Sequence, residues 1–289
     1  MHPDLTCSAA AKAEGDDPAG SATDFTAFLL VTDHDPWSRE AGADAARKYL
    51  APEAADYVVT GGDGMRGFAV RTARRRRAAG GGAPYHLGRV GGVLYVTGSV
   101  PDRVALERVV AGHAPANATV DPEPLFGVCT NGRRDQCCAV MGRPVATALA
   151  DRYGSRITEI SHLGGHRYAG TMIVLPTGYQ YGFLDPRTAA EVVAQALDGL
   201  VHPGNLRGRA GLPPAAQAAE AYWRRQIGAA PPESVTITRV TPDGDETVVD
   251  AVVQGAATSL HVRRMDGAEI TGTRCGGKPV GVTTWELTG

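Results

Sequence analysis

The sequence predicts an α/β protein with two layered halves, followed by a small antiparallel β unit. Short apolar runs alternate twice with amphipathic helical patterns before residue 228, which is typical of layered α/β folds. Beyond that point, β-branched runs are separated by Asp-Gly turns, as expected for antiparallel strands. The 37 glycines and 19 prolines among 289 residues indicate many turns and irregular loops.

The first half opens with a strand and a helix. We expect a buried strand at residues 25–32 and a helix capped by Ser38 at residues 38–50, where apolar positions recur three and four residues apart. Gly91 and Gly92 mark a tight hairpin. Short strands are expected at residues 57–60, 68–71, 86–90 and 93–97, and a closing helix at residues 101–111.

The second half repeats this order of elements, which suggests a duplicated architecture. Strands are expected at residues 125–128, 157–160, 172–175 and 180–184, with helices at residues 138–153 and 186–200. A polar, glycine-rich link at residues 202–214 then leads to a helix at residues 215–227.

The last segment has a different pattern. Strands are expected at residues 235–240, 247–253, 259–264 and 280–287, with turns at Asp243-Gly244 and Asp266-Gly267. We therefore expect three units: an N-terminal αβ half at residues 1–120, a second αβ half with the functional site at residues 121–232, and an accessory β unit at residues 233–289.

Composition excludes several classes of protein. Hydrophobic residues make up 43% and charged residues 21%, and the net charge is −2, so a general binder of nucleic acid is not expected. No run approaches 18 apolar residues and the first residues lack a signal-peptide core, so we expect neither a membrane span nor export. The odd, clustered set of five cysteines fits a reducing cytoplasm better than a disulfide-stapled secreted domain.

Seven arginines and no acidic residue occur between residues 66 and 89, including the run at residues 74–77. This run has two interpretations. It could dock an acidic partner or a phosphate, or it could be a solvated loop, and the alanines and glycines that follow it favour the loop.

The residues with the clearest chemistry lie in two loops. Three cysteines occur in residues 129–138, and two histidines frame Leu-Gly-Gly in residues 162–166. Each loop follows a predicted strand, so pairing of the two strands could bring the loops together at one edge of a sheet. Because thiolates select zinc or iron–sulfur clusters and imidazole accepts both, a metal site is expected there.

The spacing favours a cluster over a zinc knuckle. Zinc knuckles place two cysteines two to four residues apart, whereas Cys129 and Cys138 enclose eight residues. A 2Fe-2S cluster can take one ligand pair from a long loop and another from a short one. Gly164-Gly165 allows the backbone to fold tightly between the histidines. Either Cys137 or Cys138 could supply the second thiolate.

These two loops resemble the sucrase/ferredoxin-like family, a branch of the thioredoxin-like ferredoxins. The specific motifs are Cys-Thr-Asn-Gly-Arg-Arg-Asp-Gln-Cys-Cys at residues 129–138 and Ser-His-Leu-Gly-Gly-His-Arg-Tyr-Ala-Gly at residues 161–170. The resemblance runs from Cys7-Ser8 through residues 207–209 to the helix around Glu220.

The resemblance implies a thioredoxin-like fold and a 2Fe-2S cluster, with Cys129 and Cys138 on one iron and His162 and His166 on the other. It implies a soluble electron carrier with an unidentified redox partner rather than a stand-alone enzyme. Neutral imidazole ligands imply a higher potential than that of an all-cysteine ferredoxin, and one that falls as the pH rises. No carboxylate pair for glycoside hydrolysis, as in a sucrase, stands out.

Two alternatives remain open. Cys137 or Cys138 could be a redox thiol of a thioredoxin-like protein, although the adjacent pair lacks Cys-X-X-Cys spacing. The Cys/His set could also hold zinc in a purely structural module. Near the site, Asp135 with an arginine is expected to pin the loop, while Arg133, Arg134 and Arg167 could bond to sulfur or steer a partner.

Overall fold

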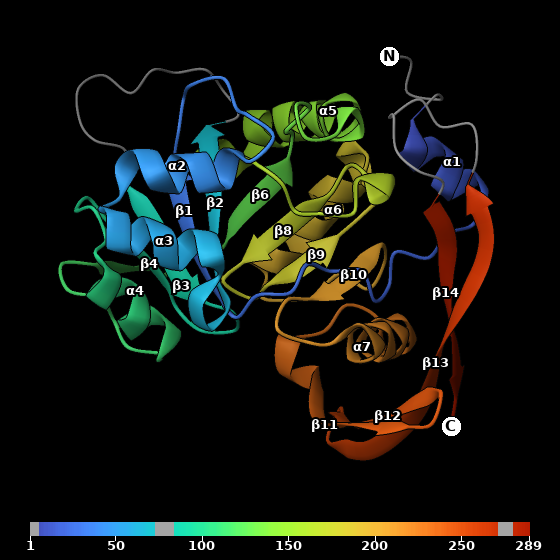
Figure 1. Cartoon of the computed structure of the whole chain (residues 1–289). Helices are drawn as coiled ribbons and strands as arrows, with labels where there is room; N and C mark the ends of the chain where they lie inside the picture. Colours follow the sequence, from blue (N-terminus) through green and yellow to red (C-terminus); the bar gives the residue numbers. More distant parts are fainter. Residues whose placement is uncertain (1–5, 73–83, 271–279) are drawn as a thin grey trace.

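A computed structural model describes residues 6–72, 84–270 and 280–289. Figure 1 shows a large curled sheet flanked by helices, and a second, smaller sheet at the C-terminal end. The helices are α1 (Cys7–Ala13), α2 (Ala41–Tyr49), α3 (Pro52–Thr60), α4 (Arg103–Val110), α5 (Gln136–Tyr153), α6 (Pro186–Leu197) and α7 (Pro214–Ile227), with short 3-10 turns η2 (Gly62–Gly64), η3 (Gly154–Arg156), η4 (His166–Tyr168) and η5 (Pro232–Ser234).

Within the described residues, the large sheet has ten strands in the order β10-β9-β8-β6-β7-β2-β1-β3-β4-β5. They are β1 (Ala27–Thr32), β2 (Met65–Thr72), β3 (Tyr85–Arg89), β4 (Leu94–Thr97), β5 (Thr119–Asp121), β6 (Leu125–Cys129), β7 (Ile157–Ile160), β8 (Met172–Leu175), β9 (Tyr179–Tyr181) and β10 (Leu206–Arg209). The predicted α/β class with a separate antiparallel β unit is confirmed.

The same strand arrangement occurs twice in this sheet. In the first half, β1 is parallel to β2 and antiparallel to β3, which pairs with β4. In the second half, β6 is parallel to β7 and antiparallel to β8, which pairs with β9. Both sets have the strand order of a thioredoxin-like sheet, so the two halves have one topology.

The two halves join through β2 and β7, which are antiparallel and overlap only near their carboxyl ends. Val70 pairs with Ile160 in this ladder, while Thr32 at the end of β1 pairs with Val70, and Cys129 at the end of β6 pairs with Ile160. The loops that leave β1 and β6 therefore begin close together at the centre of the sheet. Crevices at such carboxyl ends are where α/β sheets commonly bind ligands.

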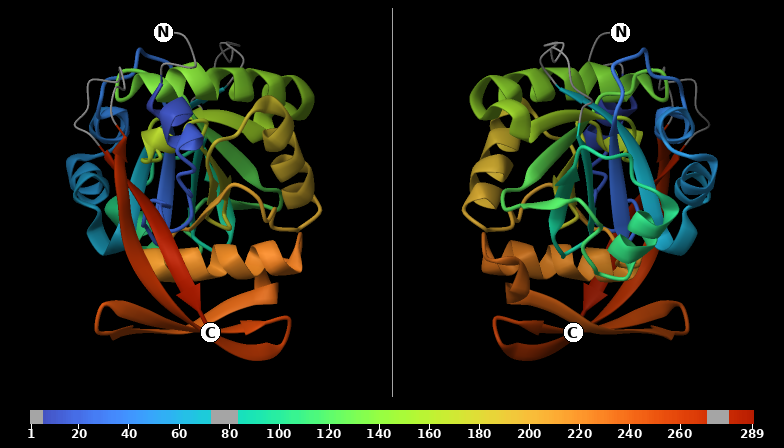
Figure 2. Two further views of the ribbon diagram at one scale, coloured as in Figure 1. Left: turned by 90° about the vertical axis from the view of Figure 1, so that its right-hand side faces the viewer. Right: turned by 90° about the vertical axis from the view of Figure 1, so that its left-hand side faces the viewer.

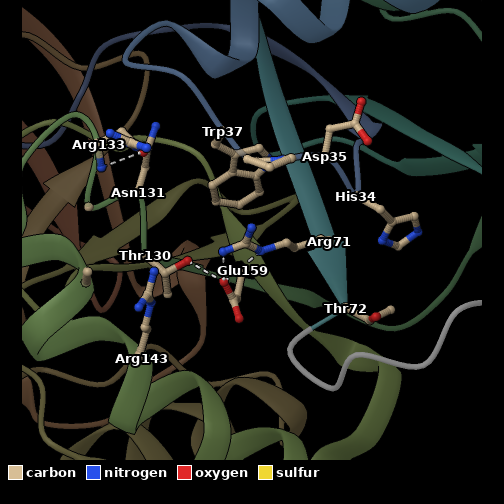
Figure 3. Close-up of a pocket in the computed structure, with 13 residues that line it drawn as sticks. His34, Asp35, Trp37, Arg71, Thr72, Thr130, Asn131, Arg133, Arg143 and Glu159 are labelled. Atoms are coloured by element: carbon tan, nitrogen blue, oxygen red, sulfur yellow. Dashed lines mark hydrogen bonds and ion pairs between the residues drawn. The ribbon is translucent and has the colours of Figure 1, made fainter.

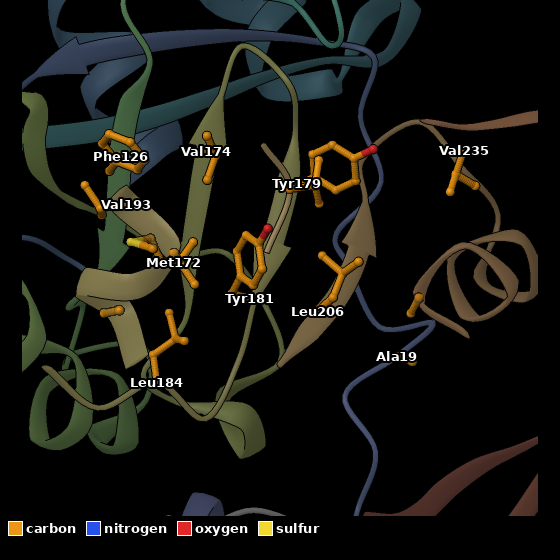
Figure 4. Close-up of a cluster of buried hydrophobic side chains, with 14 of the residues drawn as sticks. Ala19, Phe126, Met172, Val174, Tyr179, Tyr181, Leu184, Val193, Leu206 and Val235 are labelled. Carbon is orange, nitrogen blue, oxygen red and sulfur yellow. The ribbon is translucent and has the colours of Figure 1, made fainter. Parts of the chain in front are cut away.

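Successive side chains along each strand point to opposite faces of the sheet, so the apolar core is divided between the two faces. In β1, Leu29 and Val31 pack with the residues of α2, α3 and α4, whereas Phe28 and Leu30 lie on the other face. In β6, Phe126 packs against the helices of the second half (Figure 4). The opposite face of both halves shares one apolar cluster, and Cys129 and Cys138 belong to it.

The C-terminal sheet is formed by β11 (Val235–Asp243), β12 (Glu246–Val253), β13 (Ala256–Ile270) and β14 (Val280–Thr288), in that order. Its Val249 and Leu260 share a core with α7, so the unit packs on the second half. Figure 2 shows β13 and β14 rising past α7 toward α1. The Arg167 Nη1 donates to the Gly281 carbonyl oxygen at 2.6 Å, which ties β14 to η4.

A buried polar network fixes α7 to β9 and β10. Glu220 and Arg224 of α7 are fully buried, and the Tyr179 hydroxyl donates to Glu220 Oε1 at 2.7 Å. Arg224 Nη2 donates to the Tyr179 hydroxyl at 2.9 Å, and Arg209 Nε lies 3.3 Å from Glu220 Oε2. Buried charges require such partners. Helix α7, which contains Glu220 and ends the family resemblance, therefore has a structural role and supports β10.

Some predicted elements were wrong. Residues 57–60 belong to α3 rather than to a strand, because Pro52 starts a helix whose Ala54, Ala55 and Val58 pack on the sheet. Helix α2 begins at Ala41, without a side-chain cap. Ser38 instead bonds to Asp44 Oδ2 at 2.5 Å and accepts from the Glu40 N–H at 3.0 Å, in the turn before the helix.

Other differences concern short elements and turns. Asp266 and Gly267 do not form a turn, because β13 continues through them with an irregularity before Glu269. The predicted link at residues 202–214 contains β10, and α1 and β5 were missed. β10 pairs with β9 and β5 pairs with β4, so these two short strands depend on their partners. The division at residues 120 and 232 stays a prediction.

Candidate metal centre

The carboxyl end of β6 places Cys129 in the interior. Its side chain is fully buried, and its Sγ lies 3.9 Å from the Ser161 carbonyl oxygen, at the start of the histidine loop. The Leu163 backbone N–H donates to the same sulfur. The predicted pairing of the strands before the two loops is confirmed, because β6 and β7 are parallel neighbours.

Helix α5 brings Cys138 to the same place. Cys138 lies in the first turn of α5 and is 1% exposed. Gly142, one turn further on, allows this close approach, because a Cβ there would lie 2.1 Å from the Cys129 carbonyl oxygen. A larger residue at this position would push α5 away from β6 and separate the two thiols.

The histidine loop folds back tightly between His162 and His166. Gly164 and Gly165 both have positive φ, at 70° and 62°. A Cβ on Gly165 would lie 2.5 Å from Arg207 Nη2, so glycine is required for two reasons, backbone conformation and space. The loop continues into η4, where His166 is the first residue.

The structure sorts the Cys and His side chains into two groups. Ligand atoms of Cys129, Cys138 and His162 all lie within 4.8 Å of one another. His166, the fourth predicted ligand, groups instead with Cys7 and Cys137, again within 4.8 Å. Since Cys137 adjoins Cys138 and the two histidines share one short loop, the two groups are neighbours.

The ring nitrogens of the two histidines are suited to ligation. His162 Nδ1 and His166 Nδ1 are both buried and have no hydrogen-bond partner among the residues that the structure describes. A buried nitrogen without a partner costs free energy unless a ligand or ion satisfies it. Two thiols and two such imidazoles form a soft, mixed donor set of the kind that holds zinc or an iron–sulfur cluster. The residues therefore fit the implied 2Fe-2S group.

Cys129 and Cys138 are joined by a hydrogen bond that shifts their pKa values in opposite directions. The hydrogen bond from Cys138, supported by His162, holds the pKa of the Cys129 thiol well below its usual value despite burial. The same bond and the burial raise the pKa of Cys138. Because thiolates are the form that ligates metal, the lowered pKa of Cys129 favours its ligating form.

A buried cation lies beneath the loop. Arg207 in β10 is 1% exposed, and it donates to the Ser21 hydroxyl at 3.1 Å and to the Gly164 carbonyl oxygen at 3.2 Å. Burial lowers its pKa to about 10, while Tyr168 and the Cys129 and Cys138 thiols counteract this. The guanidinium remains charged at neutral pH, so it places a positive charge near the thiols.

Asn131 anchors the cysteine loop, although the sequence had suggested Asp135 for this role. The buried Asn131 accepts from the Arg133 N–H at 3.1 Å, and its Nδ2 donates to the Ser38 carbonyl oxygen at 2.9 Å. Asp135 Oδ2 lies 3.9 Å from His162 Nε2. The Asn-Gly dipeptide was the available signal, since it marks a turn.

The other predicted border residues form separate contacts. Arg134 pairs with Glu40. Arg167 Nε lies 3.0 Å from Asp16 Oδ2, whose carboxylate is fully buried. Arg167 therefore links η4 to the segment after α1. Its ion pair is with Asp16, rather than the bond to a cysteine sulfur that the sequence had suggested. The arginines at residues 74–77 and Cys275 lie outside the described residues.

An open cavity of about 960 Å³ adjoins the cysteine loop (Figure 3). It lies between the loop after β1 and the start of α5, with the Arg71–Glu159 pair as its floor. Arg133 and Arg143 reach its rim, and neither forms an ion pair within the described part of the chain. Thr130, directly after Cys129, also lines this cavity.

The fold and this site define a thioredoxin-like α/β protein with a buried cysteine–histidine cluster. The sequence profile of the sucrase/ferredoxin-like family matches residues 18–208, about two thirds of the chain. The chain therefore belongs to the sucrase/ferredoxin-like family, and the predicted family is confirmed.

Among characterised proteins, the chain is similar to altered inheritance of mitochondria protein 32 of Candida glabrata. The two are 29% identical over an aligned length of 96 positions, an alignment that covers 28% of this chain and 31% of that protein. The chain thus matches about a third of that relative's length. No solved structure matches. Within the described residues, no helix is both long enough and apolar enough to cross a bilayer.

Proposed function

We propose that the protein is an electron carrier with a 2Fe-2S cluster held by Cys129, Cys138, His162 and His166. The observation that supports this most strongly is the burial of Cys129 and Cys138 close to His162, in a loop where neither histidine Nδ1 has a hydrogen-bond partner among the described residues. Membership of a ferredoxin-like family supports it independently. When bound, such a cluster would supply reversible one-electron transfer at a potential raised by the imidazole ligands.

The chain's own residues would control the environment of the cluster. Cys129 would bind as a thiolate, because its pKa is already lowered by the hydrogen bond from Cys138. Leu163 would donate its N–H to the sulfur, and Arg207 would offset negative charge. His166 would have to turn from Cys7 and Cys137 toward the Cys129 group, a change of side-chain direction within one loop.

We further propose that an acidic redox partner approaches through the cavity beside Thr130. Arg133 and Arg143 at its rim supply positive charge, and Thr130 connects the cavity directly to Cys129. Electrostatic complementarity of this kind speeds association. A cytoplasmic location fits the thiol-rich site, because buried reduced cysteines persist in a reducing compartment.

The test is metal and sulfide analysis with a visible spectrum, on protein purified without oxygen and after cluster reconstitution. We expect about two irons and two sulfides per chain, and different spectral changes in His162→Cys and His166→Cys. A His202→Cys variant is the matched control, because His202 accepts from the Gly204 N–H and belongs to neither Cys/His group, so it should leave the spectrum unchanged. One zinc, or no metal after reconstitution, would reject the electron-carrier function.

A further inference from the structure

The structure contains a second pair of thiols beside the candidate centre. Cys7 and Cys137 lie with His166 in a group whose ligand atoms are all within 4.8 Å of one another. Neither cysteine belongs to the proposed cluster ligands, and neither forms a disulfide with another cysteine in the described part of the chain. The two residues are 130 positions apart in the chain, so only the tertiary fold brings them together.

The pair is held at the contact between α1 and the histidine loop. Cys7 is the first residue of α1, and Cys137 lies in the first turn of α5. The next residue after Cys7, Ser8, donates its hydroxyl to the Ala169 carbonyl oxygen. After α1, Asp16 pairs with Arg167 at 3.0 Å. Contacts on both sides of Cys7 therefore keep its sulfur close to that of Cys137.

We propose that Cys7 and Cys137 are a redox-active dithiol, which forms a disulfide by exchange with a low-molecular-weight disulfide such as oxidised glutathione. The structure disfavours an exchange between Cys137 and Cys138, because Cys138 groups with Cys129 and His162 instead. This assignment goes beyond the proposed electron-carrier function, because it uses residues outside the cluster set and does not require a bound cluster.

The exchange proceeds in two balanced steps. The Cys7 thiolate attacks one sulfur of oxidised glutathione, so the glutathione S–S bond breaks, a Cys7–glutathione bond forms and one reduced glutathione leaves. The Cys137 thiolate then attacks the Cys7 sulfur, which releases the second glutathione thiol and closes the Cys7–Cys137 bond. The two cysteine thiols lose two electrons and two protons in total, and oxidised glutathione gains them to become two molecules of reduced glutathione.

The burial of the two sulfurs suggests this order. Cys7 is 7% exposed and Cys137 is fully buried, so an external disulfide reaches Cys7 first. Cys7 also lies on a helix of only seven residues, and so short an element opens locally at low cost. Cys137 is then the resolving thiol, because it is within a few ångströms of the attacked sulfur.

Oxidation would attach α1 covalently to α5 beside His166. In the reduced protein, α1 is held by Ser8, Asp16 and apolar contacts of Cys7 and Cys137 with Ala169. In the oxidised protein, a bond would join the same elements. The thiol state of the protein would therefore control whether the helix that covers His166 can open.

The experiment equilibrates the full-length protein in glutathione redox buffers, traps thiols with N-ethylmaleimide and maps the peptides by mass spectrometry. We expect a linked Cys7–Cys137 peptide to accumulate as the buffer becomes oxidising. A second readout uses the exposed Lys12. Trypsin cleavage there should release the N-terminal peptide from reduced protein, whereas in oxidised protein the peptide should stay attached until a reductant is added.

Two cysteine variants, together with control of the cluster content, test whether the disulfide joins Cys7 to Cys137. Cys137→Ser should lower the yield of linked peptide at least tenfold and leave Cys7 bound to glutathione. Cys138→Ser, at the adjacent position, should leave the link intact. The wild type and Cys137→Ser are read on metal-free and on cluster-reconstituted protein, whereas Cys138→Ser, which lacks a proposed cluster ligand, is read on metal-free protein. Loss of the cluster alone therefore leaves this proposal standing. A link from Cys7 to another cysteine, no link at all, or zinc bound to Cys7 and Cys137 would overturn it.

Discussion

Arg71 and Glu159 face each other across the junction of the two halves of the sheet. They are direct partners in the β2–β7 ladder, and Arg71 Nη2 lies 2.7 Å from Glu159 Oε2. Arg71 also stacks on Trp37, with its Cζ 4.1 Å from the centre of the indole ring. Glu159 accepts a hydrogen bond from the Thr130 hydroxyl at 2.7 Å. One ion pair therefore connects the loop after β1 with the loop that begins at Cys129.

Glu159→Ala should lower the free energy of unfolding by about 1–3 kcal/mol, because it leaves a partly buried guanidinium and a hydroxyl without their acceptor. The side chains of Arg71 and Glu159 are only 25% and 15% exposed. Urea denaturation measures the change. Glu191→Ala is the matched control, since its pair with Arg187 is 3.8 Å long and the side chains are 47% and 83% exposed. Equal losses in both variants would contradict this role of Glu159.

The N-terminus of α6 should give a pH-dependent contribution to stability. Asp185 Oδ1 accepts from the Thr188 N–H at 2.8 Å and from the Arg187 N–H at 2.9 Å. The bond from the Thr188 N–H is the main cause of the lowered pKa of Asp185. Asp185→Ala should therefore cost about 1 kcal/mol at pH 7, as for other N-caps.

The sign of the pH effect follows from that lowered pKa. The unfolded chain binds the proton more tightly, so the charged cap stabilises the fold fully above the ordinary carboxyl value of 3.8 and loses this effect as the pH falls through the lower folded value. Asp185→Asn keeps a capping oxygen and should show a smaller loss between pH 5 and pH 2 (about the range of this titration). Identical pH profiles of stability for the two proteins would be the contrary result.

Arg207 should raise the potential of the proposed cluster. Its buried guanidinium interacts with both cluster thiols, and its side-chain nitrogens bond to carbonyl and hydroxyl oxygens. Removing this charge in Arg207→Gln should lower the potential by about 60 mV, which is a tenfold change for one electron. Arg207→Lys keeps the charge and should recover most of the shift in a redox titration. The same potential in all three proteins would remove Arg207 from this role.

Arg143 should steer anionic electron acceptors toward the cavity beside Thr130. In stopped-flow oxidation by ferricyanide, Arg143→Glu should react roughly tenfold more slowly than the wild type at low ionic strength. The difference should vanish at high salt, because salt screens exposed charges. Arg152→Glu changes the net charge equally at the far, exposed end of the same helix. If it slows the reaction as much, the effect belongs to net charge rather than to the cavity.

The bounds of strands and helices were predicted best where apolar residues recur regularly along the sequence. β7 and β8 have the predicted bounds, and α6 begins at the predicted Pro186. The prediction failed at residues 57–60, where the β-branched run suggested a strand but Pro52 and the apolar stripe of α3 form a helix. Local propensity is weak compared with packing on a sheet, so short segments of this kind depend on their neighbours.

The sequence alone determined the donor types, their two loops and the family. Cys129, Cys138, His162 and His166 were predicted to lie together. Ligand atoms of the first three do so within 4.8 Å, whereas His166 groups with Cys7 and Cys137. The tertiary structure decided the rest: Cys7 lies beside Cys137, and Arg207 lies beneath the loop. The physical reason is distance along the chain, because spacing and periodicity describe neighbours in sequence, whereas the docking of α1 and the pairing of β9 with β10 are long-range contacts.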